Sequence, residues 1–246
     1  MTTTPLRPPV RLHEPGELIA AVPHMLGFHP QDSLVLLALK GDQPNKVGLT
    51  LRVDLPPSRH RRALADQLLL PVHEHESSAV LVLVVGGGPA DPPAVPHREL
   101  IEVLSDALAT IGVPLVHAAW AESTGAGASW RCYDDAECAG TVPDPRGTAL
   151  AAATAAAGLV TFASRDELAA LLTPDDESDL ARRSAMLDHA AEAAERTGSD
   201  PRAALRRVRE AVERTAERDG PLDDEEIVDL AVALTDLRVR DACLAL

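Results

Sequence analysis

The stretch "PHMLGFHPQDSLVLLALKG", residues 23–41, places a turn motif directly before a continuous apolar run. The run "SLVLLAL", residues 33–39, has the length of a strand and contains no polar residue after Ser33. A strand with one buried face alternates polar and apolar residues, whereas a strand covered on both faces is apolar throughout. We therefore expect a central strand at 33–41 that is buried on both sides.

The segments that follow alternate between strand and helix patterns. Polar and apolar residues alternate over 46–56, which predicts a half-buried strand. The turn residues 40–45 would join it to the central strand as a hairpin. Helical patterns at 58–70 and 97–112 flank a second buried strand at 78–88, and a strand pair follows at 113–123 and 128–135. This order predicts an α/β domain with a layered mixed sheet and flanking helices.

The chain divides into three expected parts. Residues 1–13 are rich in Thr and Pro and are expected to be a flexible segment, and residues 14–162 form the α/β domain. Its first helix, 14–27, contains Pro23, which we expect to break or kink it. A further strand is expected at 159–164. Residues 163–246 form a helical region, because capping residues precede its helices and glycines end them.

Helix starts in this region are expected at Ser164, at Thr173 with Pro174, at Asp200 with Pro201, and at Asp223 with Glu226. The last helix runs into "CLAL", residues 243–246, without a glycine, proline or polar stop signal. We expect the helical region to be truncated, or its final apolar stripe to pack on a protein partner or on a continuation of the chain.

Composition narrows the classes of function. The net charge is −15, from 23 basic and 38 acidic residues, which argues against nucleic acid and anionic membranes as partners. No apolar stretch has the length of a membrane span, so we expect a soluble, cytoplasmic protein. Three cysteines, an odd number, do not predict a disulfide framework and fit a reducing compartment. The sequence predicts no cofactor.

The turn motif before the central strand carries His24, His29 and Asp32. These residue types suit a metal site or a base with an orienting carboxylate. The spacing of the histidines matches no regular zinc pattern, and Gly27 and Pro30 explain the motif as a turn at the entry of a strand. We interpret it mainly as structural and name His29 and Asp32 as the candidate residues if it binds a ligand.

A second cluster lies in "SWRCYDD", residues 129–135. The chain is only 2% aromatic, yet two of its five aromatic residues meet thiols and charges here. Cys132 and Cys138 do not have the spacing of a CxxC site, so no metal ligands are assigned. Aromatic residues also favour strands, which leaves a structural interpretation open beside a ligand-binding one. The candidate ligand-binding residues here are Trp130, Arg131, Tyr133 and Asp134.

Several of these stretches together resemble one family. "PGELIAAVPHMLGFHPQDSLVLLAL", "SWRCYDD" followed by "PDPRGTALAAATAAAG", "SRDELAALL" and "LTDLRVRDACLAL" are similar to the actinobacterial domain-of-unknown-function family DUF4192. The resemblance covers the chain from about Glu14 to its end. It implies no assigned activity, and it implies further helices after Arg240 and Asp241.

Two classes of function follow as expectations. The first is a non-catalytic protein-binding or regulatory module, since no reactive group of residues is evident in the sequence. The second is a small-ligand-binding protein or a hydrolase-type enzyme, with a crevice at the strand ends formed by the GFHPQD turn and the WRCYDD strand. No catalytic residues are assigned, and the oligomeric state is not predicted.

Overall fold

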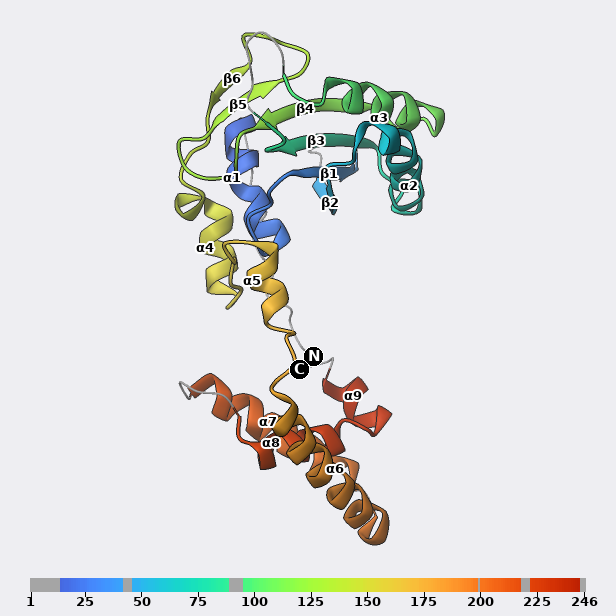
Figure 1. Ribbon diagram of the computed structural model, residues 1–246, viewed down its shortest axis with the longest axis vertical. Helices are drawn as coiled ribbons and strands as arrows, with labels where there is room; N and C mark the ends of the chain where they lie inside the picture. Colours follow the sequence, from blue (N-terminus) through green and yellow to red (C-terminus); the bar gives the residue numbers. More distant parts are fainter. Residues whose placement is uncertain (1–13, 42–45, 89–94, 199, 218–221, 244–246) are drawn as a thin grey trace. The chain divides into compact units, whose positions relative to one another are not determined.

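A computed structural model describes residues 14–41, 46–88, 95–198, 200–217 and 222–243. Its internal contacts divide the chain into two compact units, with the division between Leu172 and Thr173. The flexible segment expected at 1–13 and the apolar tail 244–246 lie outside the described residues. Figure 1 shows the helices and strands of each unit.

The first unit is built on a six-stranded mixed sheet with the strand order β2-β1-β3-β4-β5-β6. Its strands are β1 (Ser33–Lys40), β2 (Lys46–Asp54), β3 (Ala79–Val85), β4 (Leu115–Ala121), β5 (Ser129–Cys132) and β6 (Ala139–Thr141). β3 and β4 pair in parallel, while the other neighbours pair antiparallel, including the expected hairpin of β1 and β2. The sequence-based prediction of a mixed sheet with flanking helices is confirmed.

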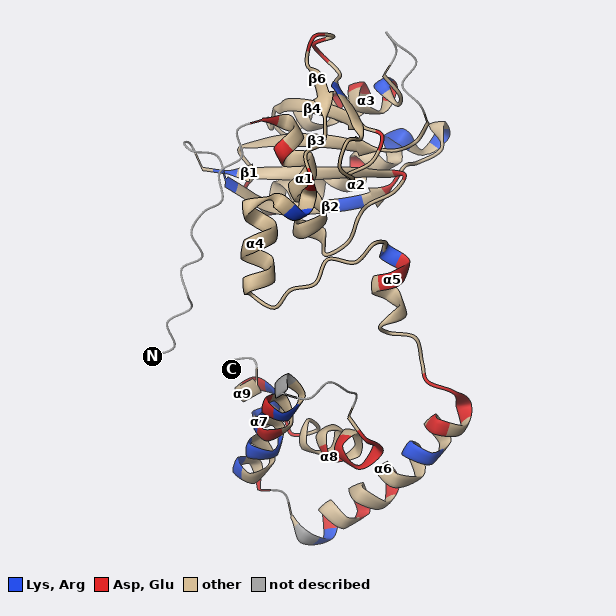
Figure 2. Ribbon diagram, turned by 90° about the vertical axis from the view of Figure 1, so that its left-hand side faces the viewer, with Lys and Arg blue, Asp and Glu red and all other residues tan. Residues whose placement is uncertain are grey.

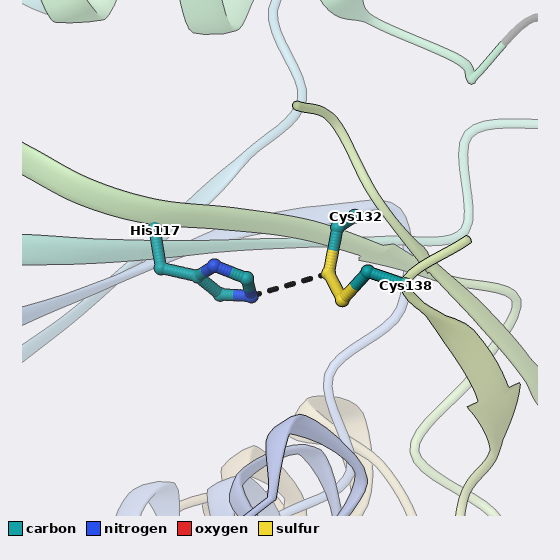
Figure 3. A group of neighbouring side chains, drawn as sticks. All are labelled: His117, Cys132 and Cys138. Carbon is teal, nitrogen blue, oxygen red and sulfur yellow. Dashed lines mark hydrogen bonds between the residues drawn. A yellow bond between two sulfur atoms is a disulfide. The ribbon is translucent and has the colours of Figure 1, made fainter. Parts of the chain in front are cut away.

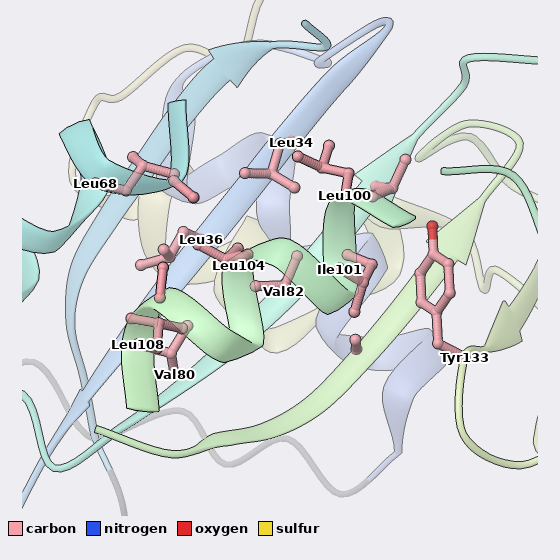
Figure 4. Close-up of a cluster of buried hydrophobic side chains, with 14 of the residues drawn as sticks. Leu34, Leu36, Leu68, Val80, Val82, Leu100, Ile101, Leu104, Leu108 and Tyr133 are labelled. Atoms are coloured by element: carbon pink, nitrogen blue, oxygen red, sulfur yellow. The ribbon is translucent and has the colours of Figure 1, made fainter. Parts of the chain in front are cut away.

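β1 is buried on both faces, as its apolar run predicts. Leu34, Leu36 and Ala38 point to one side and belong to a core cluster that also contains Val80, Val82 and Val84 of β3 (Figure 4). Val35 and Leu37 point to the other side and join a second core cluster. Side chains alternate between the two faces along a strand, so only a run without polar residues satisfies both clusters.

Helices cover both faces of this sheet (Figure 1). α2 (Arg61–Glu74) and α3 (Arg98–Thr110) supply the first cluster with apolar side chains such as Leu68, Leu104 and Leu108. α1 (Pro15–Leu26) packs on the opposite face through Ile19 and Val22. α4 (Ala149–Ala156) lies beside α1, and α5 (Arg165–Ala170) follows it. Short 3-10 turns span Ser58–His60 and Pro145–Gly147.

Two sequence-based expectations in this unit are wrong. α1 continues without a break through Pro23 to Leu26: the Pro23 ring is buried, and Gly27 N–H donates to the Pro23 carbonyl at the end of the helix. The strand expected at 159–164 reduces to one bridge, between Phe28 and Phe162. Leu159 and Val160 are mostly exposed, and neither pairs with a strand in the described part of the chain.

The cysteines also differ from expectation. Cys132 and Cys138 are joined as a disulfide across the hairpin of β5 and β6, and Cys243 is a free thiol in the second unit. The number of cysteines does not reveal that a local hairpin brings two of them to adjacent positions. β6 itself is three exposed residues long, which is too short for an apolar pattern to predict.

The second unit is helical, with α6 (Glu177–Thr197), α7 (Pro201–Glu217), α8 (Asp224–Ala233) and α9 (Leu237–Cys243). Its small core contains Ala204, Val208, Ala233 and Val239. The expected capping box of Asp223 and Glu226 opens α8. α6 begins at Glu177 and not at the expected Thr173 and Pro174, because Asp176 takes the N-cap position.

Ion pairs connect α6 to α8 in this second unit. Arg182 and Arg183 each donate through Nε to a different carboxylate oxygen of Asp224, both at 2.6 Å. The hydrogen bonds from Arg183 and then Arg182 hold the pKa of Asp224 below its ordinary value. Basic and acidic residues are interspersed along α6 (Figure 2), as is typical of a largely solvated helix. Among the described helices, none is both long and apolar enough to cross a bilayer.

Candidate ligand-binding site

One edge of the sheet collects the ends of several strands. Ser33 at the start of β1 pairs with Asp54 at the end of β2 and with Val85 at the end of β3. Val85 in turn pairs with Ala121 at the end of β4. β2, β3 and β4 therefore end at the edge where β1 begins. In open α/β sheets, the crevice outside the carboxyl ends of strands is the usual place for a ligand.

The GFHPQD turn is fixed at this edge by backbone contacts. Gly27 ends α1 in the left-handed conformation, with a φ of 81°, and donates its N–H to the carbonyl of Pro23 at 2.8 Å. The next residues pair with Phe162, whose carbonyl accepts from His29 N–H at 3.1 Å and whose N–H donates to Gly27 at 2.8 Å. The turn thus lies against residues 161–163, which lead into α5.

His29 is held through one ring nitrogen. Its Nδ1 lies 2.8 Å from the hydroxyl of Thr124, a buried residue just beyond β4. Partial burial lowers the pKa of His29, and the charge of His24 lowers it further, so the imidazole is neutral at pH 7. Its Nε2 makes no hydrogen bond to any residue that the structure describes. A neutral imidazole fixed at one nitrogen presents the other to a ligand.

Asp32 connects three strand ends. Its backbone lies in the left-handed region with a φ of 41°, which is uncommon for a residue other than glycine. The Oδ1 accepts the N–H of Gly87 at 2.8 Å, and the backbone carbonyl accepts the N–H of Leu55 at 2.9 Å. Asp32 therefore ties the loop after β3 and the segment after β2 to the start of β1.

Arg52 of β2 is engaged by its neighbours at the same edge. Its Nε donates to the hydroxyl of Ser33 at 2.8 Å, and its Nη2 donates to the carbonyl of Gln31 at 3.3 Å. The same Nη2 lies 2.7 Å from Oδ1 of Asp54. The Arg52 side chain is only 13% exposed, so it forms part of the wall and does not move freely.

These groups surround a polar pocket of about 280 Å³. Three chain segments line it: the GFHPQD turn, the last residues of β2, and the first residues of α5. The lining residues are His29, Gln31, Asp32, Arg52, Asp54, Ser164, Arg165 and Asp166. Within the described part of the chain, the side chains of Arg165 and Asp166 make no ion pair or hydrogen bond. They are the charges of the pocket that remain available to a ligand.

The structure brings together two of the six candidate residues, His29 and Asp32. The other four belong to or follow β5, and none of them lines this pocket. The register from Ser33 through Val85 and Ala121 to Trp130 crosses three strand spacings, or about 14 Å. The GFHPQD turn and the WRCYDD strand therefore occupy separate parts of the edge.

The four residues on the WRCYDD strand have different surroundings. Trp130 is buried on the α1 side, where its indole lies so close to Gly16 and Gly140 that a Cβ there would be in tight contact with it. Tyr133 is buried on the opposite face and donates its hydroxyl to the carbonyl of Pro96 at 2.6 Å. Burial raises the pKa of Tyr133, and the charge of Arg98 offsets part of that shift. Arg131 is half-buried and Asp134 is exposed.

Three residues at or beside the pocket were not predicted from the sequence: Arg52, Thr124 and Arg165. Arg52 reaches Gln31 and Ser33, and Thr124 reaches His29, only through strand register and loop geometry, which no local pattern reveals. Arg165 had a local signal, because it follows the predicted helix cap Ser164. That signal predicted a helix start and did not place the helix beside the turn.

Comparison with known proteins gives one match. The model of the family described as "Domain of unknown function (DUF4192)" matches residues 15–246. No curated protein and no solved structure matches the chain. The family match covers nearly the whole sequence, from the start of α1 to the end. The chain therefore belongs to the DUF4192 family of domains of unknown function.

Proposed function

We propose that the first unit binds a small polar molecule in the pocket at the carboxyl edge of the sheet. The observation that carries this proposal is the convergence of His29, Asp32 and Arg165 on one pocket from segments more than 100 residues apart in sequence. The support is positional as well as chemical, because β2 and β3 both end here.

The pocket chemistry indicates the class of ligand. Arg165 offers a free cation to an anionic group, while Asp166 and the neutral His29 can accept hydrogen bonds from donors of the same molecule. A volume of about 280 Å³ is at the low end for ligand pockets. These features suit a small molecule with both an anionic group and hydrogen-bond donors, such as an amino acid or a hydroxy acid. The expected cytoplasmic location makes soluble metabolites the first molecules to test.

A thermal-shift screen of amino acids, hydroxy acids and polyols tests this proposal. A ligand at free concentration c that binds only the folded state stabilises it by RT ln(1 + c/Kd), so the melting temperature rises with ligand concentration. We expect at least one anionic member of the panel to raise it for the wild type and for Arg146→Ala, and to have little effect on Arg165→Ala. Arg146 is a matched control, because it is an exposed arginine of the same unit outside the pocket.

The pH dependence gives a second readout. The pKa of His29 is lowered below 6.5, so the ring is neutral above that lowered value and a cation below it. When Nδ1 donates its proton to Thr124, the neutral ring is an acceptor at Nε2, and the cation is not. We expect the affinity for a donor-bearing ligand to fall as the pH drops through the His29 pKa. The proposal fails if no panel member shifts the melting temperature, or if Arg165→Ala responds as the wild type does.

We propose as a second candidate function that the helical unit binds an apolar helix of a partner protein. A surface hollow of about 560 Å³ lies between α6 and α8. The apolar residues that line it are Ala185, Met186, Ala190 and Val228, and the polar or charged ones are Arg182, His189, Glu225 and Asp229. Apolar side chains beside charges of both signs suit the apolar stripe of an amphipathic helix.

Affinity purification from the native cell tests this second candidate. Ala185→Glu places a charge in the hollow, whereas Ser184→Glu places one at a neighbouring exposed position that does not line it. We expect a stoichiometric partner that is retained by the wild type and Ser184→Glu and lost by Ala185→Glu. A partner lost equally by both variants, or the absence of any such partner, contradicts this assignment.

A further inference from the structure

Three potential metal ligands meet on the α1 side of the sheet, away from the pocket (Figure 3). His117 comes from β4, Cys132 from the end of β5, and Cys138 from the residue before β6. The ligand atoms of all three lie within 4.8 Å of one another, and Nε2 of His117 is 3.3 Å from Sγ of Cys132. The two sulfurs are joined as a disulfide.

Strand register places these residues together. Cys132 pairs with Ala119 of β4, so His117 occupies the diagonal position on the same face of the sheet. Cys132 and Cys138 lie opposite each other in the hairpin, with their Cα atoms 5.4 Å apart. Cys132 N–H donates to the carbonyl of Cys138 at 2.8 Å, and Arg131 pairs with Ala139 beside them.

The hairpin that carries the cysteines is held by its own backbone contacts. Asp135 accepts the N–H of Glu137 on its side chain at 2.9 Å and the N–H of Cys138 on its carbonyl at 3.3 Å. Tyr133 N–H donates to the carbonyl of Ala118 at 3.0 Å. These bonds do not involve sulfur, so the two thiols and the imidazole stay adjacent when the disulfide is reduced.

We propose that the reduced chain binds Zn²⁺ through His117, Cys132 and Cys138, with the fourth position open to water or an incoming ligand. Two thiolates and one imidazole suit zinc, and three protein ligands with a free fourth position are typical of an open zinc site. Tetrahedral bond lengths require N···S and S···S separations of about 3.5 Å and about 3.8 Å. The His117–Cys132 distance already meets the first, and reduction frees the sulfurs to reach the second.

The disulfide is the metal-free form of this site. A dithiol reductant supplies two electrons and two protons to the S–S bond and is itself oxidised to a disulfide. The cysteines become thiols, and both lose their protons when Zn²⁺ binds. Cys138 is the more accessible sulfur, because Cys132 is only 3% exposed, so the reductant attacks at Cys138 and Cys132 leaves as the thiolate beside His117.

Cobalt substitution tests the proposal on the intact chain. We expect the reduced protein, kept free of oxygen, to bind one equivalent of Co²⁺ with thiolate-to-cobalt charge-transfer absorption, and Zn²⁺ to remove that absorption. Cys138→Ser should abolish the absorption, and His117→Ala should weaken Co²⁺ binding at least tenfold. Cys243→Ser is the matched control and should leave it unchanged, because Cys243 lies in the other unit. The oxidised protein should bind no Co²⁺.

A measurement on the wild type alone avoids dependence on how the variants fold. Zn²⁺ should slow alkylation of Cys132 and Cys138 in the reduced protein, as read by peptide mass spectrometry, while Cys243 reacts at the same rate with and without metal. The proposal is overturned if reduced protein gives no charge-transfer absorption, if that absorption survives in Cys138→Ser, if His117→Ala binds Co²⁺ as tightly as the wild type, or if Zn²⁺ fails to protect the two thiols. A disulfide that cycles with thiols but gives none of these metal signals is a redox pair only, which also overturns it.

Discussion

Replacing Gly86 with alanine should cost the first unit about 2–5 kcal/mol of folding free energy. Gly86 has a φ of 72°, a conformation that an L-residue adopts at a cost of about 1–2 kcal/mol. A Cβ at this position would also lie 2.7 Å from Oδ1 and 3.2 Å from the backbone nitrogen of Asp32. Asp32 cannot move away easily, because it accepts hydrogen bonds from the N–H groups of Gly87 and Leu55.

The same substitution should impair ligand binding, because relieving the contact moves Asp32 away from the pocket. Gly127→Ala is the control, since Gly127 has a φ of 80° but no atom within 4 Å of an added Cβ. We expect Gly127→Ala to lower the free energy of unfolding by only the conformational cost of the left-handed backbone, about 1–2 kcal/mol. Chemical denaturation followed by tryptophan fluorescence measures the free energy of unfolding of both variants, because Trp120 and Trp130 lie in the first unit. Equal losses in the two variants would show that Asp32 does not crowd this loop.

Leu36→Ala should destabilise the first unit by about 2–5 kcal/mol. Leu36 is fully buried in the central strand, within the cluster that α2 and α3 cover (Figure 4). Its truncation removes apolar contacts and leaves a cavity, because a close-packed core with a sheet on one side relaxes only in part.

Leu172→Ala is the matched control for the Leu36 substitution. Leu172 is 86% exposed, so the same chemical change should alter the free energy of unfolding by less than about 0.5 kcal/mol. Both variants are measured by the same fluorescence-detected denaturation. A similarly small decrease in the free energy of unfolding of the two variants would contradict the burial of β1 on both faces.

The sequence was sufficient to predict the parts of the fold that depend on local patterns. The apolar run 33–39 predicted a strand covered on both sides, and residues 34–38 are divided between the two core clusters. The glycine after α1 and the capping box of α8 were also predicted correctly. Each of these features follows from a periodicity or a cap that acts within a few residues of its position.

The candidate site was predictable only in part, because register and loop contacts decide it. His29 and Asp32 were chosen for their place before a buried strand, and both line the pocket. Their partners Thr124 and Gly87 come from other strand ends, which the sequence does not align. Trp130 and Tyr133 were grouped because they are close in sequence. They are three residues apart, and the alternation of side chains along a strand puts them on opposite faces of the sheet.

The proximity of His117, Cys132 and Cys138 was also not predictable from the sequence. The spacing of the two cysteines matches no short metal motif, and His117 lies on a different strand. The register of β4 with β5 makes them neighbours. Contacts that depend on strand pairing therefore set both the pocket and this cluster, while local patterns set the elements that carry them.

Native mass spectrometry of the protein isolated from its own cell tests the central claim, that the edge pocket binds a small polar molecule. The protein is kept under non-denaturing conditions without dialysis, and the wild type is compared with Arg165→Ala and Arg146→Ala. We expect the wild type and Arg146→Ala to carry one added small-molecule mass that Arg165→Ala lacks. A wild type found only at the mass of the bare chain, or an added mass retained equally by Arg165→Ala, would contradict the claim.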